Sequence, residues 1–290
     1  MPANTREIRS RIKSVKNTQQ ITRALQMVAA AKIRRAQDRV TAAKPYAERI
    51  AEVFKQVASQ LSPGDFKSPL LVTRPVQRVA IVAITSDKGL SGAYNANAIR
   101  AAVNAHREWR ERGAEVELIV VGQKGVSFFR HSNFNVVSRY TQLPQIPTFA
   151  EATAIAKEAT ERFASGQVDH VELVYTNFRS MLSLVPTTQT LLPAVLPTSE
   201  GPRTASALYE FEPEPEVVMN RIIPKYLETV VYQALLESAA CQLAAQMTAM
   251  SAASKNAKEL AAALTLVYNK ARQAAITQEI LEVVGGANAL

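Results

Sequence analysis

The stretch "KYLETVVYQALLESAACQLAAQMTAMSAASKNAKELAAALTLVYNKARQAAITQEILEVV" (residues 225–284) contains neither glycine nor proline. Alanine is its commonest residue, and alanine favours helix. Pro224 precedes it and suits the first turn of a helix, whereas Gly285 and Gly286 follow it and suit a C-terminal cap. At 1.5 Å per residue the stretch predicts a helix about 90 Å long. Such a helix is not stable alone in water, so it requires a partner along its length.

Residues 5–44 also lack glycine and proline and predict a second long helix, which Pro45 can kink before the pattern resumes. Steps of alternating fours and threes along both helices collect apolar or small side chains, the repeat that is typical of a coiled coil. In the C-terminal helix this seam contains Leu227, Val231, Ala234, Ser238 and Cys241. We therefore predict an antiparallel coiled coil of the two chain ends, with Cys241 as a buried, unreactive thiol.

The middle of the chain alternates apolar runs with helical patterns. The apolar runs predict strands at 79–85, 116–122, 171–178 and 182–193, and two helical stretches between them each end in glycine. Such alternation indicates an α/β domain. The predicted fold class is α/β, with a long antiparallel coiled coil of the N- and C-terminal helices and a central Rossmann-like α/β domain. The predicted boundaries are an N-terminal helix at 1–60, the central domain at 61–215 and a C-terminal helix at 216–290.

A glycine-containing turn, Asp87-Lys88-Gly89-Leu90-Ser91-Gly92, joins the first predicted strand to a helix. Strand, glycine turn and helix is also the layout of phosphate-binding loops. However, Lys88 precedes the glycines instead of following them as in a Walker loop, and Gly89 and Gly92 supply only part of a dinucleotide-binding fingerprint. Asp87 also places a carboxylate where phosphate would sit. We therefore favour a structural turn with exposed side chains over a nucleotide-dependent enzyme.

The charge of the chain is concentrated at its start. The formal net charge is +9, and residues 1–60 carry all of it, with 13 Lys and Arg against 4 Asp and Glu. Such a segment predicts an acidic partner, and a coiled-coil nucleic-acid-binding protein is one interpretation. A single cysteine and three widely spaced histidines argue against a zinc site. A charged start and the lack of an 18-residue apolar run predict a soluble, intracellular protein.

Three blocks of the sequence are similar to a known family: "IRSRIKSVKNTQQITRALQMVAAAKIRRAQ" (8–37), "ITSDKGLSGAYN" (84–95) and "AAQMTAMSAASKNAKELAAALTLVYNKARQAAITQEILEVVGGA" (244–287). Over essentially its whole length the chain resembles the gamma subunit of F-type ATP synthases. The resemblance implies a central rotor shaft whose paired terminal helices stand inside a hexamer of alpha and beta subunits. Its α/β domain would lie beside the epsilon subunit on the c-ring.

The resemblance also implies how the chain would work. Proton flow would turn the c-ring and the shaft together, and the asymmetric shaft would bring each beta subunit through different nucleotide affinities, coupling rotation to ATP synthesis. Since the chemistry takes place at alpha–beta interfaces, the chain would be a non-catalytic subunit. We expect no catalytic residue, no cofactor, no metal site and no nucleic-acid partner.

By motif position, the resemblance assigns three groups of contact residues. A catch on a beta-subunit loop would be formed by Arg272, Gln273, Thr277 and Glu279. An acidic lever loop of the beta subunit would face Leu25, Arg23 and Lys32. A hydrophobic sleeve would hold the tip of the shaft through Ile276, Ile280, Leu281 and Val284. Each position has an alternative role in pairing the two helices.

The chain departs from the family pattern at two places. Gln246 replaces the arginine that is usual at its motif position, so a guanidinium contact there is in doubt. The loop after the strand at 171–178 is short and free of cysteine, which predicts no thiol switch of the kind found in the plant form. A start at Met without a transit peptide suggests a bacterial protein. We expect peripheral association with a plasma or thylakoid membrane, on the cytoplasmic side.

Overall fold

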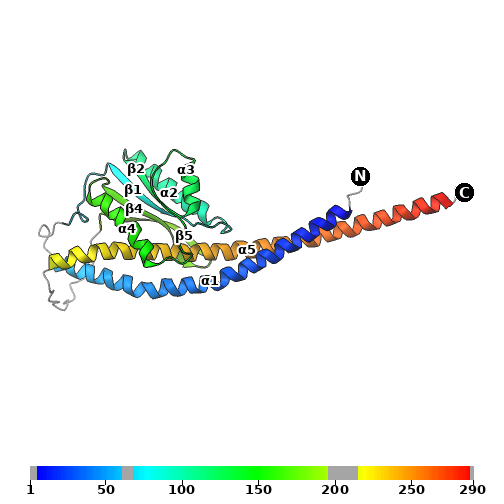
Figure 1. The fold of residues 1–290 in the computed structure, drawn as a ribbon, viewed down its shortest axis with the longest axis horizontal. Helices are drawn as coiled ribbons and strands as arrows, with labels where there is room; N and C mark the ends of the chain where they lie inside the picture. The colour runs from blue at the N-terminus through cyan, green and yellow to red at the C-terminus, as the bar shows by residue number, and fades with distance from the viewer. Residues whose placement is uncertain (1–4, 61–67, 195–214, 288–290) are drawn as a thin grey trace. The chain divides into compact units, whose positions relative to one another are not determined.

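The computed structural model describes residues 5–60, 68–194 and 215–287. Figure 1 shows an α/β domain and two long helices, one from each end of the chain. In chain order the helices and strands are α1 (Thr5–Gln60), β1 (Arg78–Ile84), α2 (Tyr94–Glu111), β2 (Glu115–Val121), α3 (Gln123–Arg130), β3 (Asn135–Tyr140), α4 (Phe149–Ala164), β4 (His170–Ser180), β5 (Ser183–Leu192) and α5 (Pro215–Ala287).

The five strands form one sheet in the order β3-β2-β1-β4-β5. β1 pairs in parallel with β2 and β4, β3 pairs in parallel with β2, and β5 is antiparallel to β4. Crossover helices cover a parallel sheet on both faces, so its central strands are apolar on both sides. β1 accordingly is buried at every residue from Val79 to Ile84.

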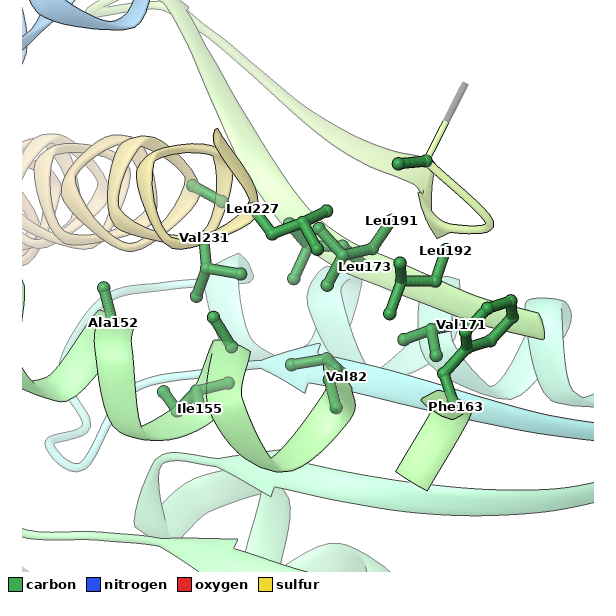
Figure 2. Close-up of a cluster of buried hydrophobic side chains, with 14 of the residues drawn as sticks. Val82, Ala152, Ile155, Phe163, Val171, Leu173, Leu191, Leu192, Leu227 and Val231 are labelled. Carbon is green, nitrogen blue, oxygen red and sulfur yellow. The ribbon is translucent and has the colours of Figure 1, made fainter. Parts of the chain in front are cut away.

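Alternate residues of β1 face two different clusters of buried side chains. Ala80, Val82 and Ile84 pack on the face that is covered by α4 and by the first turns of α5. Figure 2 shows Val82 of this cluster with Ile155 and Phe163 of α4 and with Leu227 and Val231 of α5. Val79, Ile81 and Ala83 belong to the opposite face, with residues of α2 and α3. The sheet is therefore the middle layer of three.

Packing divides the chain into two compact units, one of residues 32–245 and one that joins residues 1–31 to 246–290. We call them the sheet unit and the end unit. In the sheet unit α1 and α5 run side by side in opposite directions (Figure 1). Phe54 stacks on Tyr226 with ring centroids 5.0 Å apart, and Ile33 and Ala36 pack with Ala240 and Leu243. The predicted boundaries at 60 and 216 lie at or next to the C-terminal end of α1 and the N-terminal end of α5. The division by packing instead falls inside both helices, after residue 31 in α1 and after residue 245 in α5.

The end unit is a pair of helix segments. The guanidinium of Arg9 on α1 lies over the ring of Tyr268 on α5, 5.8 Å from its centroid. Its buried side chains among the described residues are mostly small: Thr22, Ala29, Met250, Ala257 and Ala261. Small side chains allow two helix backbones to approach closely, but they remove little apolar area from water.

The ends of α5 differ from the sequence expectation. The helix begins at Pro215, so Pro224 lies inside it and not in its first turn. It also continues through Gly285 and Gly286 to Ala287, so the expected glycine cap is absent at that position. α1 likewise passes through Pro45 without interruption. Two elements, α3 and β3, were not predicted at all, because each is short and β3 is only half-buried.

Hydrogen bonds as well as apolar contacts join β4 to α5 in the sheet unit. The backbone N–H of Thr176 donates to Ser238 Oγ at 3.3 Å, and the Cys241 thiol donates to the Thr176 carbonyl at 3.4 Å. Asn177 Nδ2 donates to Glu237 Oε2 at 2.9 Å. Cys241 is buried as predicted, and burial raises the pKa of its thiol. These directional bonds fix the rotation of α5 against the sheet.

Candidate functional site

The carboxyl ends of β1 and β2 meet at one edge of the sheet, where the glycine turn lies. Ligands of open α/β sheets bind at this edge, so it is the first place to search for a site. Thr85, the residue after β1, is buried and its Oγ1 donates to the Val121 carbonyl at 2.7 Å. The same oxygen accepts the N–H of Gly125, the third residue of α3, at 2.9 Å. Thr85 therefore joins β1 to the start of α3.

The carboxylate of Asp87 is occupied by backbone amides. Its Oδ1 accepts the N–H of Gln123, the first residue of α3, at 2.8 Å, and its Oδ2 accepts the N–H of Leu143 at 2.9 Å. A helix N-terminus leaves such N–H groups without intrahelical partners, and an anion is favourable there. Asp87 thus supplies internally the negative charge that a phosphate would bring, which supports the structural interpretation of the turn.

At Gly122 the backbone passes very close to the backbone of Thr85. The φ of Gly122 is +93°, and a Cβ added to it would lie 2.5 Å from the Thr85 carbonyl oxygen. Only glycine fits both conditions. In the turn itself Leu90 and Gly92 also have positive φ, while Lys88 and Leu90 are exposed. Within the described ranges, no cluster of three or more His, Cys, Asp or Glu side chains could hold a metal ion.

The predicted catch residues lie close together on α5 in the end unit. Arg272, Gln273, Thr277 and Glu279 are all exposed, and Thr277 Oγ1 donates to the Gln273 carbonyl at 2.9 Å. The helix therefore satisfies the Thr277 hydroxyl itself. The long side chains of the other three project into solvent within two helical turns, so they can be presented to a partner together.

The predicted tip residues are exposed although they are apolar. Ile276, Ile280, Leu281 and Val284 are between 47% and 66% exposed. Since Arg9 lies over Tyr268 and the helices are antiparallel, Thr5 is reached about one turn further on, opposite residue 272. The tip residues thus extend past the described part of α1. A group of exposed large apolar side chains marks an interaction surface.

The predicted lever residues do not share one environment. Arg23 is exposed and Leu25 half-buried in the end unit, whereas Lys32 belongs to the sheet unit. Lys32 Nζ donates to Gln145 Oε1 at 2.5 Å, so it has a partner within the chain. Gln246, which replaces the usual arginine, is half-buried on α5.

The family of the chain follows from comparisons over its full length. A family model described as ATP synthase matches residues 4–290. The ATP synthase gamma chain of Brevibacillus brevis is 46% identical over 289 residues, which cover 100% of this chain and 99% of the relative. The chain belongs to the ATP synthase gamma chain family. This membership does not favour the nucleic-acid-binding alternative.

Other family members refine the comparison. The gamma chain of Heliobacterium modesticaldum is 47% identical and covers 98% of both chains. That of Gloeobacter violaceus is 46% identical and covers 99% of both, but its alignment spans 312 positions, more than the 290 residues of this chain. This cyanobacterial relative therefore carries residues that the present chain lacks.

Chains of solved ATP synthase structures have a similar fold. A chain of the central stalk and c-ring of the Tetrahymena thermophila mitochondrial ATP synthase gives a TM-score of 0.60 at 28% identity, covering 81% of this chain and 99% of that one. A chain of the Euglena gracilis mitochondrial ATP synthase gives a TM-score of 0.67 at 18% identity, covering 98% and 94%. None of the helices in the described ranges is long and apolar enough to cross a membrane.

Proposed function

We propose that this chain is the central rotor shaft of an F-type ATP synthase and is itself non-catalytic. It would couple the rotation of a proton-driven c-ring to conformational change and ATP synthesis in an alpha–beta hexamer. The observation that carries the proposal is the 46% identity to a gamma chain over 100% of the sequence. A ligand shifts an equilibrium only if it binds the competing states differently, and an asymmetric shaft meets that condition for the beta subunits.

The end unit supplies the contacts with the hexamer in this proposal. Exposed Arg272 and Gln273, with Thr277 and Glu279 nearby, form the catch on a beta subunit. The exposed apolar side chains of Ile276, Ile280, Leu281 and Val284 enter a hydrophobic sleeve. Burial of these side chains in a partner would remove the apolar surface that the chain alone leaves in water.

The basic first helix supplies a second contact. Arg23 and Leu25 face an acidic lever loop of the beta subunit, where the exposed guanidinium adds attraction that salt weakens. Lys32 takes part only if its ammonium leaves Gln145. The sheet unit contacts the epsilon subunit and the c-ring, which holds the chain peripherally on the cytoplasmic side of a bacterial plasma or thylakoid membrane.

Reconstitution tests the proposal. The full chain is mixed with alpha and beta subunits of the same organism, and ATP hydrolysis is measured with and without it. We expect stimulated hydrolysis and a stable complex, and neither nucleotide binding nor hydrolysis by the chain alone. Failure to co-purify with alpha and beta subunits, or hydrolysis by the isolated chain, would contradict the proposal.

The catch is tested in the same assay by Arg272→Ala combined with Gln273→Ala. We expect the stimulated hydrolysis rate to fall several-fold, because polar contacts with a beta subunit are lost. Lys270→Ala combined with Gln278→Ala is the matched control, since both side chains are exposed on the same helix. Equal effects of the two double variants would remove the catch from the proposal.

A further inference from the structure

A cavity of about 540 Å³ lies at the carboxyl edge of the sheet, within the sheet unit. Its walls come from segments far apart in the sequence: the residues after β1, the start of α3, the segment 142–147 and one face of α5. Leu143, Pro144 and Leu235 give it an apolar wall, and Tyr94 and Gln242 also line it. Small-molecule sites in proteins have this size and this mixture of apolar walls and few polar groups.

Hydrogen bonds hold the polar part of the wall in place. Asp87 accepts two backbone amides, and one of them, from Leu143, fixes the segment 142–147. Gln145 of the same segment accepts from Lys32. These two acceptors of the wall are thus engaged by the protein itself, and the segment 142–147 is held without a ligand.

One donor in the wall has no such partner. Gln242 is 5% exposed, and its Nε2 lacks a hydrogen-bond partner among the described residues. A buried amide nitrogen without a partner is unfavourable, so such groups in native proteins call for an explanation. The Nε2 atom itself is covered in the structure, so a ligand reaches it only when the amide, whose terminal torsion is soft, turns towards the cavity.

The charged residues that line the cavity are Lys88 and Asp87, and the Asp87 carboxylate already accepts two backbone amides. Two further lysines flank them. Lys32 holds Gln145, and the Lys124 ammonium would be 3.6 Å from a Cβ added at Gly89. The surroundings therefore favour a negative ligand.

We propose that this cavity binds a small organic carboxylate with an apolar body. The carboxylate oxygen accepts from Gln242 Nε2, the ammonium of Lys88 adds favourable charge, and the apolar body packs against Leu143, Pro144 and Leu235. The site shares no residue with the catch or the tip, and of the proposed lever residues only Lys32 touches its wall, through Gln145.

Binding of 1-naphthoate to the full chain tests the proposal. The methyl groups of Leu235 are observed by NMR during titration, because contacts between them and the naphthalene protons place the probe in the cavity. We expect saturable binding at millimolar or lower concentration. Naphthylmethylamine, which has the same body and the opposite charge, should bind at least about fivefold more weakly.

Three variants separate the cavity from the rest of the surface. Gln242→Leu should weaken naphthoate binding at least about fivefold, since it removes the donor and keeps the volume. Lys88→Ala, at an exposed position that folding tolerates, should weaken it about two- to threefold. Gln278→Leu, an exposed glutamine of the same helix, should leave it unchanged.

Several outcomes would overturn the proposal. They are the absence of saturable binding, equal binding of the amine, and unchanged binding in both Gln242→Leu and Lys88→Ala. If Gln242→Leu does not fold, unchanged naphthoate binding by Lys88→Ala is sufficient to overturn the proposal. Loss of naphthoate binding when alpha, beta and epsilon subunits are added would show that a partner protein fills the cavity, and would also refute the proposal.

Discussion

The helices α1 and α5 pass through both compact units, but they have different packing partners in each. In the sheet unit α5 packs on one face of a sheet whose central strand is buried on both faces, and α1 packs along α5. In the end unit the same two helices have only each other, and small residues such as Ala29 and Ala257 form the buried seam. Most of the large apolar side chains that stay exposed also lie there. From this comparison we expect the sheet unit to carry most of the stability of the chain, whereas the end unit gains more from a partner.

The largest expected effect is on the stability of the sheet unit. Phe163 is fully buried beside Val171 and Leu192 (Figure 2), with the Arg74 guanidinium 4.9 Å from its ring centroid. Phe163→Ala should lower the free energy of unfolding by about 3–5 kcal/mol. Urea unfolding followed by circular dichroism measures the loss. Phe128→Ala, at a side chain that is 44% exposed, is the control and should cost much less.

A smaller effect is expected from the turn. Asp87→Ala leaves the backbone amides of Gln123 and Leu143 without their acceptor. Loss of hydrogen bonds to a charged group should lower the free energy of unfolding by about 1.5–3 kcal/mol. Lys88→Ala, at the exposed next residue, should change it by less than about 0.5 kcal/mol. An Asp87→Ala variant as stable as Lys88→Ala would show that the turn does not hold this edge together.

The sheet unit should also respond to acid. Burial raises the pKa of Glu158, but hydrogen bonds from Ser138, Tyr140 and Arg162 outweigh burial and leave it lowered. A lowered carboxyl pKa stabilises the fold above its unfolded-state value of 4.5, and this contribution is lost as the pH falls through the folded-state value.

The quantity to measure is the melting temperature of the wild type minus that of Glu158→Gln. We expect this difference to decrease as the pH is lowered below about 4.5. Glu117, also bonded to Arg162, has a raised pKa because of burial, so its protonation at low pH favours the folded state. The same measurement in a Glu117→Gln background therefore reports the contribution of Glu158 alone. A constant difference in melting temperature between wild type and Glu158→Gln across this pH range would contradict the assignment.

The smallest effect on stability is expected in the end unit. Ile276→Gln, Ile280→Gln and Leu281→Gln together should change the free energy of unfolding of the isolated chain by about 0.5 kcal/mol or less, because these side chains are exposed. The same triple variant should stimulate an alpha–beta hexamer less than the wild type. A large loss of stability in the isolated chain would show that these residues are buried by the chain itself.

The sequence predicted the elements that have a long uninterrupted helical pattern or a continuous apolar run. The 60 residues after Pro224 are an example of the first, and the run at 79–85 is an example of the second. It failed where a short element depends on distant neighbours, as for α3, whose first N–H is bound by Asp87 from the preceding crossover. Proline and glycine misled at the ends of α5, because the helix begins before Pro224 and continues through Gly285.

The candidate cavity could not be predicted for the same reason. Nothing in the pattern around Gln242 distinguishes it from other glutamines of the long helix. Its burial and its place in the cavity wall arise only when the segment 142–147 and the end of β1 come to the same face of α5. A clue was present at Gly122, a glycine directly after a buried strand, which indicates a close approach of backbone at that edge.

The hydrogen bonds between β4 and α5 have a mechanical consequence. Apolar contacts are not directional, whereas hydrogen bonds are, so these bonds constrain the rotation of the helix in addition to its close packing. Each residue step turns a helix by about 100°, so such a step would break the bonds that Ser238, Glu237 and Cys241 make with Thr176 and Asn177. Rotation of α5 against the sheet is therefore resisted by these bonds as well as by packing.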